Sequence, residues 1–270
     1  MIKNKIRQLW SEGKPALNGW LSVPNSFTAE IMAAQGYDSL TIDIQHGALD
    51  YSDALPMFQA MRASGVVPMA RPSWLEPGII MKALDAGAYG IICPMVNNAE
   101  DAARLVSYCR YPPKGQRSFG PTRALYAAGG NYAAEANDEI LVLAMIETAD
   151  GIRNVKEICA TPGIDGVYIG PSDLTLAVAE GRLRSGLDRE EPEMIEVIHA
   201  IRDAAKEAGI RACLHTGHAD YAARGIEWGF DLVTVHSDAG LLADAARASV
   251  ERFRDLTGTE LAPVNKREGY

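Results

Sequence analysis

The stretch ILVLAMIETADGIRNVKEICATPGIDGVYIGPSDL, residues 140–174, contains the structural unit from which the architecture is built. It has an apolar run at Ile140–Glu147, a connecting segment, and a second apolar run at Gly166–Gly170. Short apolar runs bounded by turn signals are typical of parallel strands that are buried on both faces. Parallel neighbours need a crossover, which is usually a helix. The stretch therefore predicts a strand, a helical connection and a second parallel strand.

The same alternation recurs along the whole chain. We expect eight strands, at Ala16–Val23, Ser39–Gln45, Val67–Arg71, Tyr89–Pro94, Ile140–Glu147, Gly166–Gly170, Arg211–Thr216 and Asp231–His236. Helical stretches follow them, for example Ser52–Ser64, Glu76–Ala86, Ala99–Arg110, Glu193–Ala208 and Leu241–Leu256. Several end just before a glycine, the residue that best adopts the left-handed conformation after a helix. The pattern predicts an α/β fold, a single-domain (β/α)8 TIM barrel over residues 1–257 with a C-terminal tail at 258–270.

Composition narrows the function classes. The chain has 270 residues, 47% of them hydrophobic and 23% charged, which is typical of a globular protein. Its formal net charge of −9, without a stripe of Lys and Arg, argues against nucleic acid as a partner. The first residues, MIKNKIRQLW, lack the apolar core of a signal peptide, and the longest aliphatic run is Ile140–Ile146, so we expect no membrane partner and a cytoplasmic location. The cysteines lack metal-site spacing, and we expect Cys93, Cys109, Cys159 and Cys213 to be reduced and mostly buried.

Two long connections interrupt the alternation, and long connections in a compact domain are often functional. They lie at Tyr111–Asp138 and Leu176–Glu191. We expect both to rise from the same rim of the barrel.

Polar residues close most of the predicted strands, where the active site of such a barrel lies. They are Asp43, Gln45, His46, Arg71, Glu147, Ser172, Asp173, His215, Thr216, His236 and Asp238. Glu147 and Asp173 close neighbouring strands, and paired carboxylates are typical ligands of Mg²⁺ or Mn²⁺. Either carboxylate could instead serve a helix N-terminus. Gly170, Pro171 and Ser172 form a turn whose backbone N–H groups suit an anion.

His46 and Arg71 are the other candidates for chemistry. A histidine at this rim suits proton transfer, and Asp43, which is close in sequence, is a candidate to orient its ring. A guanidinium beside a metal suits a carboxylate or an enolate oxygen, although a simple rim ion pair is the alternative. His215, His218 and His236 are an alternative zinc set, which the carboxylate pair outranks.

The order of several motifs at successive strand ends resembles the HpcH/HpaI aldolase family. The motifs are DIQH at 43–46, RPSW at 71–74, PMVNNA at 94–99, YPPKG at 111–115, IET at 146–148 and GVYIGPSDL at 166–174. The resemblance runs from about Leu17 to Phe253. It implies a metal-dependent class II pyruvate aldolase, similar to 4-hydroxy-2-oxoheptanedioate aldolases, on a (β/α)8 barrel.

The resemblance also implies roles for individual residues. Glu147 and Asp173 would bind the divalent cation, Mg²⁺ or Mn²⁺ with Co²⁺ or Zn²⁺ as alternatives, and Ser172 would contact substrate. Arg71 would stabilise the enolate and His46 would transfer the proton. Asp85, rather than Asp43, would raise the basicity of that histidine. Family members look like dimers of trimers that exchange their last helix, so a homo-oligomer, a trimer or hexamer, is implied.

Two positions depart from the family pattern. Met145 stands where these aldolases often have a glutamine that contacts substrate, and Gln45 replaces a frequent glutamate. We therefore expect an altered way of holding the 2-oxo acid.

The expected reaction is reversible aldol cleavage of a 4-hydroxy-2-oxo acid to pyruvate or hydroxypyruvate and an aldehyde. Three alternatives remain: decarboxylation of oxaloacetate, a citrate lyase-like reaction on a CoA thioester, and a barrel that binds an acid without catalysis. A lysine Schiff base ranks behind the metal mechanism, because no lysine closes a predicted strand.

Overall fold

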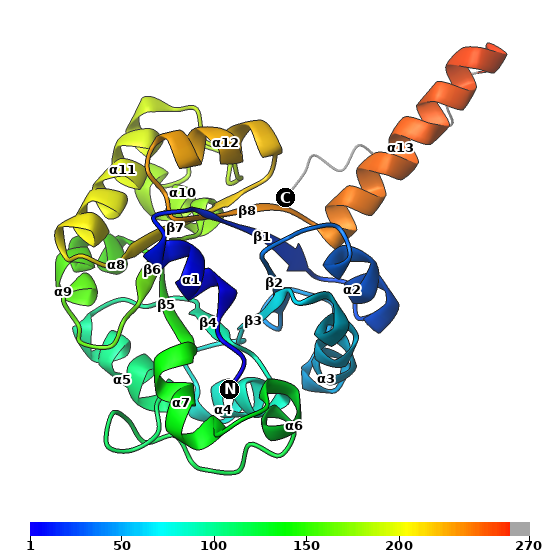
Figure 1. The fold of residues 1–270 in the computed structure, drawn as a ribbon. Coiled ribbons are helices and arrows are strands. Elements are labelled where there is room, and N and C mark those ends of the chain that lie inside the picture. Colours follow the sequence, from blue (N-terminus) through cyan, green and yellow to red (C-terminus); the bar gives the residue numbers. More distant parts are fainter. Residues whose placement is uncertain (260–270) are drawn as a thin grey trace.

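Eight parallel strands close into a barrel in chain order in the computed structural model, which describes residues 1–259 (Figure 1). The strands are β1 (Ala16–Leu21), β2 (Ser39–Asp43), β3 (Val67–Arg71), β4 (Gly90–Cys93), β5 (Leu141–Ile146), β6 (Gly166–Ile169), β7 (Arg211–Thr216) and β8 (Leu232–Ser237). The predicted (β/α)8 fold is therefore confirmed. From residue 260 onward, the tail expected at 258–270 lies outside the described residues.

Most of the helices follow a strand and cover the outside of the barrel (Figure 1). They are α1 (Lys5–Ser11), α2 (Ser26–Ala33), α3 (Tyr51–Ala60), α4 (Pro77–Ala86), α5 (Ala99–Cys109), α6 (Ala124–Ala128), α7 (Tyr132–Glu139), α8 (Ala149–Arg153), α9 (Val155–Cys159), α10 (Pro171–Ala179), α11 (Pro192–Glu207), α12 (Ala219–Glu227) and α13 (Asp238–Thr257). A 3₁₀ turn at Met61–Ser64 extends α3 and ends at Gly65, which has a φ of 77°. That glycine acts as the predicted stop signal.

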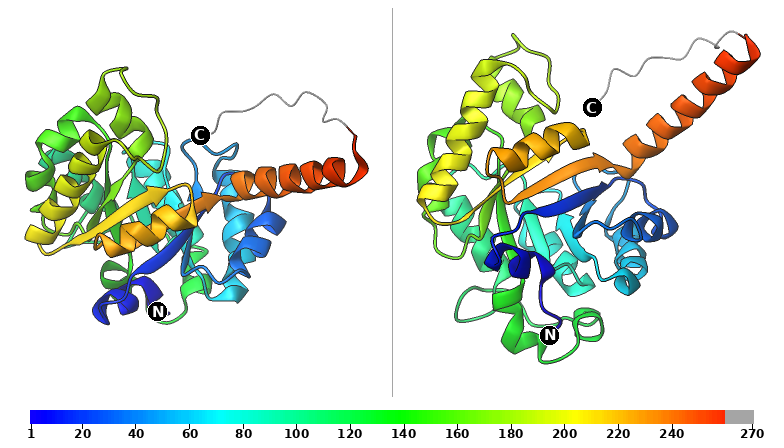
Figure 2. Two further views of the ribbon diagram at one scale, coloured as in Figure 1. Left: turned by 90° about the horizontal axis from the view of Figure 1, so that it is seen from above. Right: turned by 45° about the horizontal axis from the view of Figure 1, so that its top comes forward.

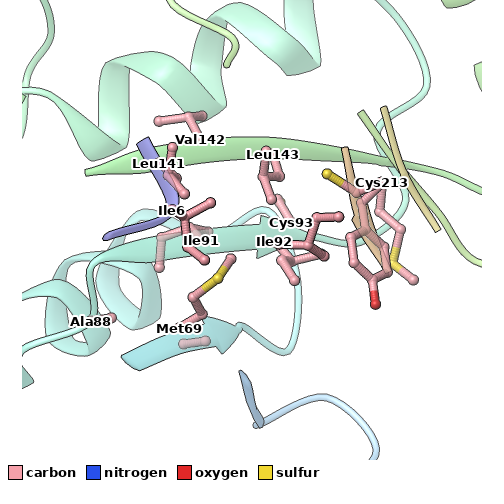
Figure 3. Close-up of a cluster of buried hydrophobic side chains, with 14 of the residues drawn as sticks. Ile6, Met69, Ala88, Ile91, Ile92, Cys93, Leu141, Val142, Leu143 and Cys213 are labelled. Carbon is pink, nitrogen blue, oxygen red and sulfur yellow. The ribbon is translucent and has the colours of Figure 1, made fainter. Parts of the chain in front are cut away.

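Strand register sets which side chains share the barrel interior. Asp43 pairs with Arg71, and Thr41 with Met69. Paired residues of neighbouring strands point to the same side, and successive residues alternate. Figure 3 shows buried apolar side chains packed around β4 and β5, among them Ile92 and Leu143. The core therefore fixes β3, β4 and β5 and, with them, the residues that follow these strands.

The two long connections lie at different ends of the barrel, contrary to the expectation that they share a rim. Residues 111–138 join α5 to β5, and a connection from helix to strand lies at the N-terminal ends of the strands. The backbone N–H of Ile2, which precedes β1, accordingly donates to Ala128 O at 2.7 Å. Residues 180–191 follow α10 at the other rim, where Ser185 Oγ donates to Ser172 O at 2.9 Å. Only the second connection reaches the strand ends that carry chemistry.

The last helix, α13, leaves the barrel instead of packing along it (Figures 1 and 2). Apolar side chains on this helix are exposed, namely Leu241, Leu242, Val250, Phe253 and Leu256. Within the described residues, no helix is both long and apolar enough to cross a membrane.

Candidate active site

The centre of the site is an ion pair between Asp43 and Arg71, the last residues of β2 and β3. Arg71 donates from Nε to Asp43 Oδ1 at 2.8 Å and from Nη2 to Oδ2 at 2.7 Å. Both side chains are buried. Burial by itself raises the pKa of Asp43, but the hydrogen bonds and charge of Arg71 outweigh it and hold the pKa below its ordinary range. The pair is a permanently charged, bidentate unit.

Trp20, from β1, supports this pair from one side. Its indole Nε1 donates to Asp43 Oδ2 at 3.1 Å. The Arg71 guanidinium lies over the Trp20 ring, 4.9 Å from the ring centroid. Among the described residues, Asp43 binds Nε and Nη2 of Arg71, and Nη1 has no protein acceptor.

Glu147 follows β5 and is almost completely buried. Its Oε1 accepts a hydrogen bond from the backbone N–H of Met95 at 2.8 Å. Burial, reinforced by the negative charge of Asp173, raises the pKa of Glu147 to about 7. A cation close to both Glu147 and Asp173 would favour the ionised form of Glu147 and lower its pKa.

The surroundings of Glu147 and Asp173 fit a hard divalent cation. Asp173 lies in the first turn of α10 and is exposed. A Cβ placed on Gly170 would lie 2.5 Å from Glu147 Oε2, so the glycine keeps the space beside this oxygen open. Two carboxylates are enough for Mg²⁺ or Mn²⁺, which commonly take further ligands from water and substrate. Consistent with that open arrangement, the described residues contain no group of three or more His, Cys, Asp or Glu arranged to hold a metal.

The zinc alternative finds no set of three ligands among the described residues. His215 Nδ1 contacts Tyr168 Oη at 2.8 Å, His218 Nδ1 contacts Asp188 at 2.7 Å, and His236 Nε2 contacts Asp244 at 3.0 Å. Each histidine thus uses a ring nitrogen on a different partner.

The structure places His46 just after β2 with an exposed side chain. Asp43 Oδ1 accepts a hydrogen bond from the backbone N–H of His46 at 3.2 Å. Asp43 therefore positions the loop that carries His46, and the hydrogen bonds of the described residues do not connect its carboxylate to the imidazole. The expectation that Asp43 orients the ring is corrected, because Arg71 and Trp20 occupy its oxygens.

Asp85 lies far from the role that the family resemblance implies. It is in the last turn of α4, at the N-terminal end of the barrel, and Arg117 Nη2 donates to its Oδ1 at 2.6 Å. Arg117 is buried between the rings of Tyr111 and Tyr132. Within the described part of this chain, the partner of Asp85 is Arg117, and no hydrogen bond joins it to His46.

The sequence pattern did not single out two polar groups of the site, the indole N–H of Trp20 and the hydroxyl of Tyr168. Tyr168 lies inside the GVYIGPSDL motif and is fully buried, yet its hydroxyl contacts both Thr234 Oγ1 at 2.6 Å and His215 Nδ1 at 2.8 Å. The His215 ring meets the Trp20 ring edge-on at 4.6 Å. Burial, and next the charge of Arg71, lower the pKa of His215 to about 3. The signal was available, since β6 and β7 are neighbours in which Tyr168 pairs with Cys213, so that Tyr168 and His215 point to the same side.

Charge interactions connect residues at four neighbouring places on the rim: the end of β3, the end of β5, the start of α10 after β6, and the end of β7. The charge of Arg71 affects the pKa of both Glu147 and His215, and Asp173 affects that of Glu147. The candidate site therefore combines a fixed cationic fork, the buried carboxylate of Glu147, the exposed carboxylate of Asp173, and the exposed His46 on the loop held by Asp43.

Comparisons with known proteins point to the family that the order of the motifs resembles. The family model described as HpcH/HpaI aldolase/citrate lyase matches residues 18–245. A hydroxypyruvate/pyruvate aldolase of Rhizorhabdus wittichii is 42% identical over 253 residues, covering 94% of this chain and 100% of the relative. A 4-hydroxy-2-oxo-heptane-1,7-dioate aldolase of Shigella flexneri is 32% identical over 272 residues, with full coverage of both chains. A crystal structure of a family protein from Burkholderia cenocepacia J2315 superposes with a TM-score of 0.85 at 31% identity, covering 93% of this chain and 100% of the other.

Proposed function

The chain belongs to the HpcH/HpaI aldolase/citrate lyase family, and from this premise we propose that it catalyses reversible aldol cleavage of 4-hydroxy-2-oxo acids to an aldehyde and pyruvate or hydroxypyruvate. The observation that carries the proposal is the placement of the Arg71 fork beside the Glu147 and Asp173 carboxylates. Cleavage leaves an electron pair on the carbon next to the keto group, so the enzyme must stabilise an enolate.

Glu147 and Asp173 are the residues that would hold the cation, and Mg²⁺ or Mn²⁺ fits their oxygen donors. When bound, a divalent cation supplies a Lewis acid for the keto group of a 2-oxo acid. Gly170, Pro171 and Ser172 bring a helix N-terminus next to this position. The backbone of this turn is suited to the carboxylate of the substrate.

Arg71 contributes the fixed positive charge. Its Nε and Nη2 are held by Asp43, which prevents the guanidinium from rotating away when substrate leaves. The remaining Nη1 is positioned to donate to the oxygen on which negative charge develops. Because Asp43 is already bound on both oxygens, we assign it the role of positioning Arg71 rather than of acting as a base.

His46 is the candidate for proton transfer. Its exposed ring is in contact with solvent, and its backbone N–H is anchored to the same carboxylate that holds Arg71. In cleavage it would accept the proton of the C4 hydroxyl, directly or through water. We propose this role for His46 and none for Asp85, which is paired with Arg117.

The test is a screen of purified protein with pyruvate and hydroxypyruvate as donors and a panel of aldehydes, with Mn²⁺ or Mg²⁺ and after chelation. We expect aldol products only with the cation present. Cation-dependent release of CO₂ from oxaloacetate without any aldol product would instead favour the decarboxylase alternative.

We also propose that α13 docks on a second copy of the chain. An apolar groove lies on the outside of β8 and β1, where a further helix of the barrel would pack, and it is lined by residues such as Leu17, Tyr37, Ala222 and Ile226. In this chain α13 turns away from the groove and exposes its apolar face (Figure 2). A reciprocal exchange of α13 would cover both surfaces, which supports a homo-oligomer.

A further inference from the structure

A chain of hydrogen-bonded polar side chains runs through the interior of the barrel. Ser39 Oγ and Thr41 Oγ1 donate to Asn18 Oδ1 at 2.8 Å and 3.1 Å. Asn18 Nδ2 donates to Thr234 Oγ1 at 2.9 Å. All four side chains are completely buried. The interior of such a barrel is usually filled by branched apolar residues, so a buried polar chain needs a reason.

The chain continues through Tyr168 to His215. Tyr168 Oη lies 2.6 Å from Thr234 Oγ1 and 2.8 Å from His215 Nδ1. The hydroxyl oxygen of Thr234 accepts a hydrogen bond from Asn18 Nδ2. Among the described residues, the acceptor in contact with the Thr234 hydroxyl that can take its proton is Tyr168 Oη. Tyr168 therefore accepts from Thr234 and must donate to His215, because a buried hydroxyl that donates to nothing is costly.

The direction of these hydrogen bonds fixes the tautomer of His215. If Nδ1 accepts from Tyr168, the proton of the neutral imidazole is on Nε2. The ring stays neutral, since burial and the charge of Arg71 lower its pKa to about 3. His215 is therefore a neutral ring with one N–H donor that remains for another partner.

The position of His215 places that donor on the floor of the site. Its ring and the Arg71 guanidinium contact the same indole, at 4.6 Å and 4.9 Å from the Trp20 ring. The side chain is half-buried, whereas Trp20 and Tyr168 beneath it are buried. In the proposed function, a 2-oxo acid bound by Arg71 would therefore lie next to this ring.

We propose that His215 is a specificity-determining residue whose Nε2–H donates to a hydroxyl substituent of the 2-oxo acid donor, so that the site favours a hydroxylated donor over an unsubstituted one. This inference rests on the proposed function. A single neutral donor cannot compensate a second carboxylate, so the group that it selects is an uncharged oxygen. Arg71 and the two carboxylates already serve the charged and keto oxygens of the donor.

The tautomer is tested first, by NMR on protein with ¹⁵N-labelled histidine. The chain has 5 histidines, and the His215→Phe spectrum identifies the signal to follow. We expect Nε2 of His215 to be protonated and Nδ1 to be unprotonated, without titration over the neutral range. In Tyr168→Phe we expect a mixture of tautomers. An Nδ1-protonated ring in the unmodified protein overturns the proposal.

Specificity is tested by comparing kcat/KM for hydroxypyruvate and pyruvate with one common aldehyde. His215→Phe removes the donor and keeps an aromatic ring, and we expect a loss of about tenfold with hydroxypyruvate and little change with pyruvate. His215→Gln restores an N–H donor and should recover part of the ratio. His199→Phe, on the outer helix α11, is the matched control and should leave both values unchanged.

The outcomes separate this inference from the proposed function. Equal losses with both donors in His215→Phe, or an unchanged ratio, overturn the specificity role. If the unmodified protein converts neither donor, the aldolase assignment fails, while the tautomer measured by NMR still tests the hydrogen-bond chain.

Discussion

Glu147 makes the stability of the metal-free protein depend on pH in an unusual direction. Its pKa rises from 4.5 to about 7 on folding, chiefly because of burial. The folded state then holds a proton that the unfolded chain has already released, so stability falls as pH rises from about 4.5 to about 7 and is level above. At ~1.4 kcal/mol per pH unit, the expected loss from this residue is ~3 kcal/mol.

Glu147→Gln isolates this contribution. A glutamine Oε1 can still accept the hydrogen bond from Met95, but the side chain never ionises. With chelator present, we expect the free energy of unfolding of the variant, relative to the unmodified protein, to be higher by ~3 kcal/mol at pH 8 than at pH 4.5. Asp173→Asn removes the neighbouring charge, so its decline with pH should be shallower than that of the unmodified protein.

The assay is urea unfolding across this pH range at one fixed protomer concentration. Subtracting the free energy of unfolding of the unmodified protein from that of the variant cancels the contribution of groups that titrate alike in both proteins. Adding Mn²⁺ or Mg²⁺ should abolish the difference at pH 8 by stabilising the unmodified protein, and should do little for Glu147→Gln. Parallel pH curves for the two proteins without metal would refute the argument that Glu147 is an uncompensated buried acid.

Four further outcomes are expected. Exhaustive chelation should abolish aldol activity and Mn²⁺ or Mg²⁺ should restore it, whereas full activity in metal-free protein contradicts a cation-dependent mechanism. Met145→Gln should change the ratio of kcat/KM among pyruvate, hydroxypyruvate and longer 2-oxo acids, because an amide can donate a hydrogen bond and a thioether cannot; unchanged ratios would show that this side chain does not reach the donor. Arg71→Ala should lower both aldol cleavage and oxaloacetate decarboxylation by ~10²- to 10³-fold. His46→Ala should lower aldol cleavage by ~10²- to 10⁴-fold and leave decarboxylation unchanged. Equal losses of both reactions in His46→Ala would argue against a role of this histidine in proton transfer. Phe253→Asp on α13 should shift light scattering toward smaller species, and an unmodified protein that is already monomeric would contradict helix exchange.

The strands were predictable because the interior of a parallel barrel demands short apolar runs. Val67–Arg71 and Arg211–Thr216 match the structure at both ends. The candidate rim residues Arg71, Glu147 and Asp173 came from the same pattern, since each lies at or just after the end of such a run, although an ion pair or a helix N-terminus could use them too. Local pattern and topology agree at these positions.

Contacts between distant segments were not predictable. Sequence proximity suggested Asp43 as the partner of His46, but strand register pairs Asp43 with Arg71 instead. Asp85 pairs with Arg117, which lies in the connection at 111–138. The sequence pattern predicted no helix in this connection, but the structure has α6 and α7 there. Which of several nearby charges a carboxylate binds depends on packing that no local pattern encodes.

Asp43 and Glu147 are both buried carboxylates at the same rim, but their neighbours suit them to different roles. Asp43 has a permanent cation on both oxygens, and its pKa is held below the ordinary range. Glu147 is equally buried, yet the largest effect of a neighbouring charge on it comes from another acid, Asp173, and its pKa rises to about 7. Burial alone would disfavour both charges, so the difference is the partner. Asp43 is therefore committed to holding Arg71, whereas Glu147, in the proposed function, would bind a cation, and near neutral pH a proton would compete with that cation for its carboxylate.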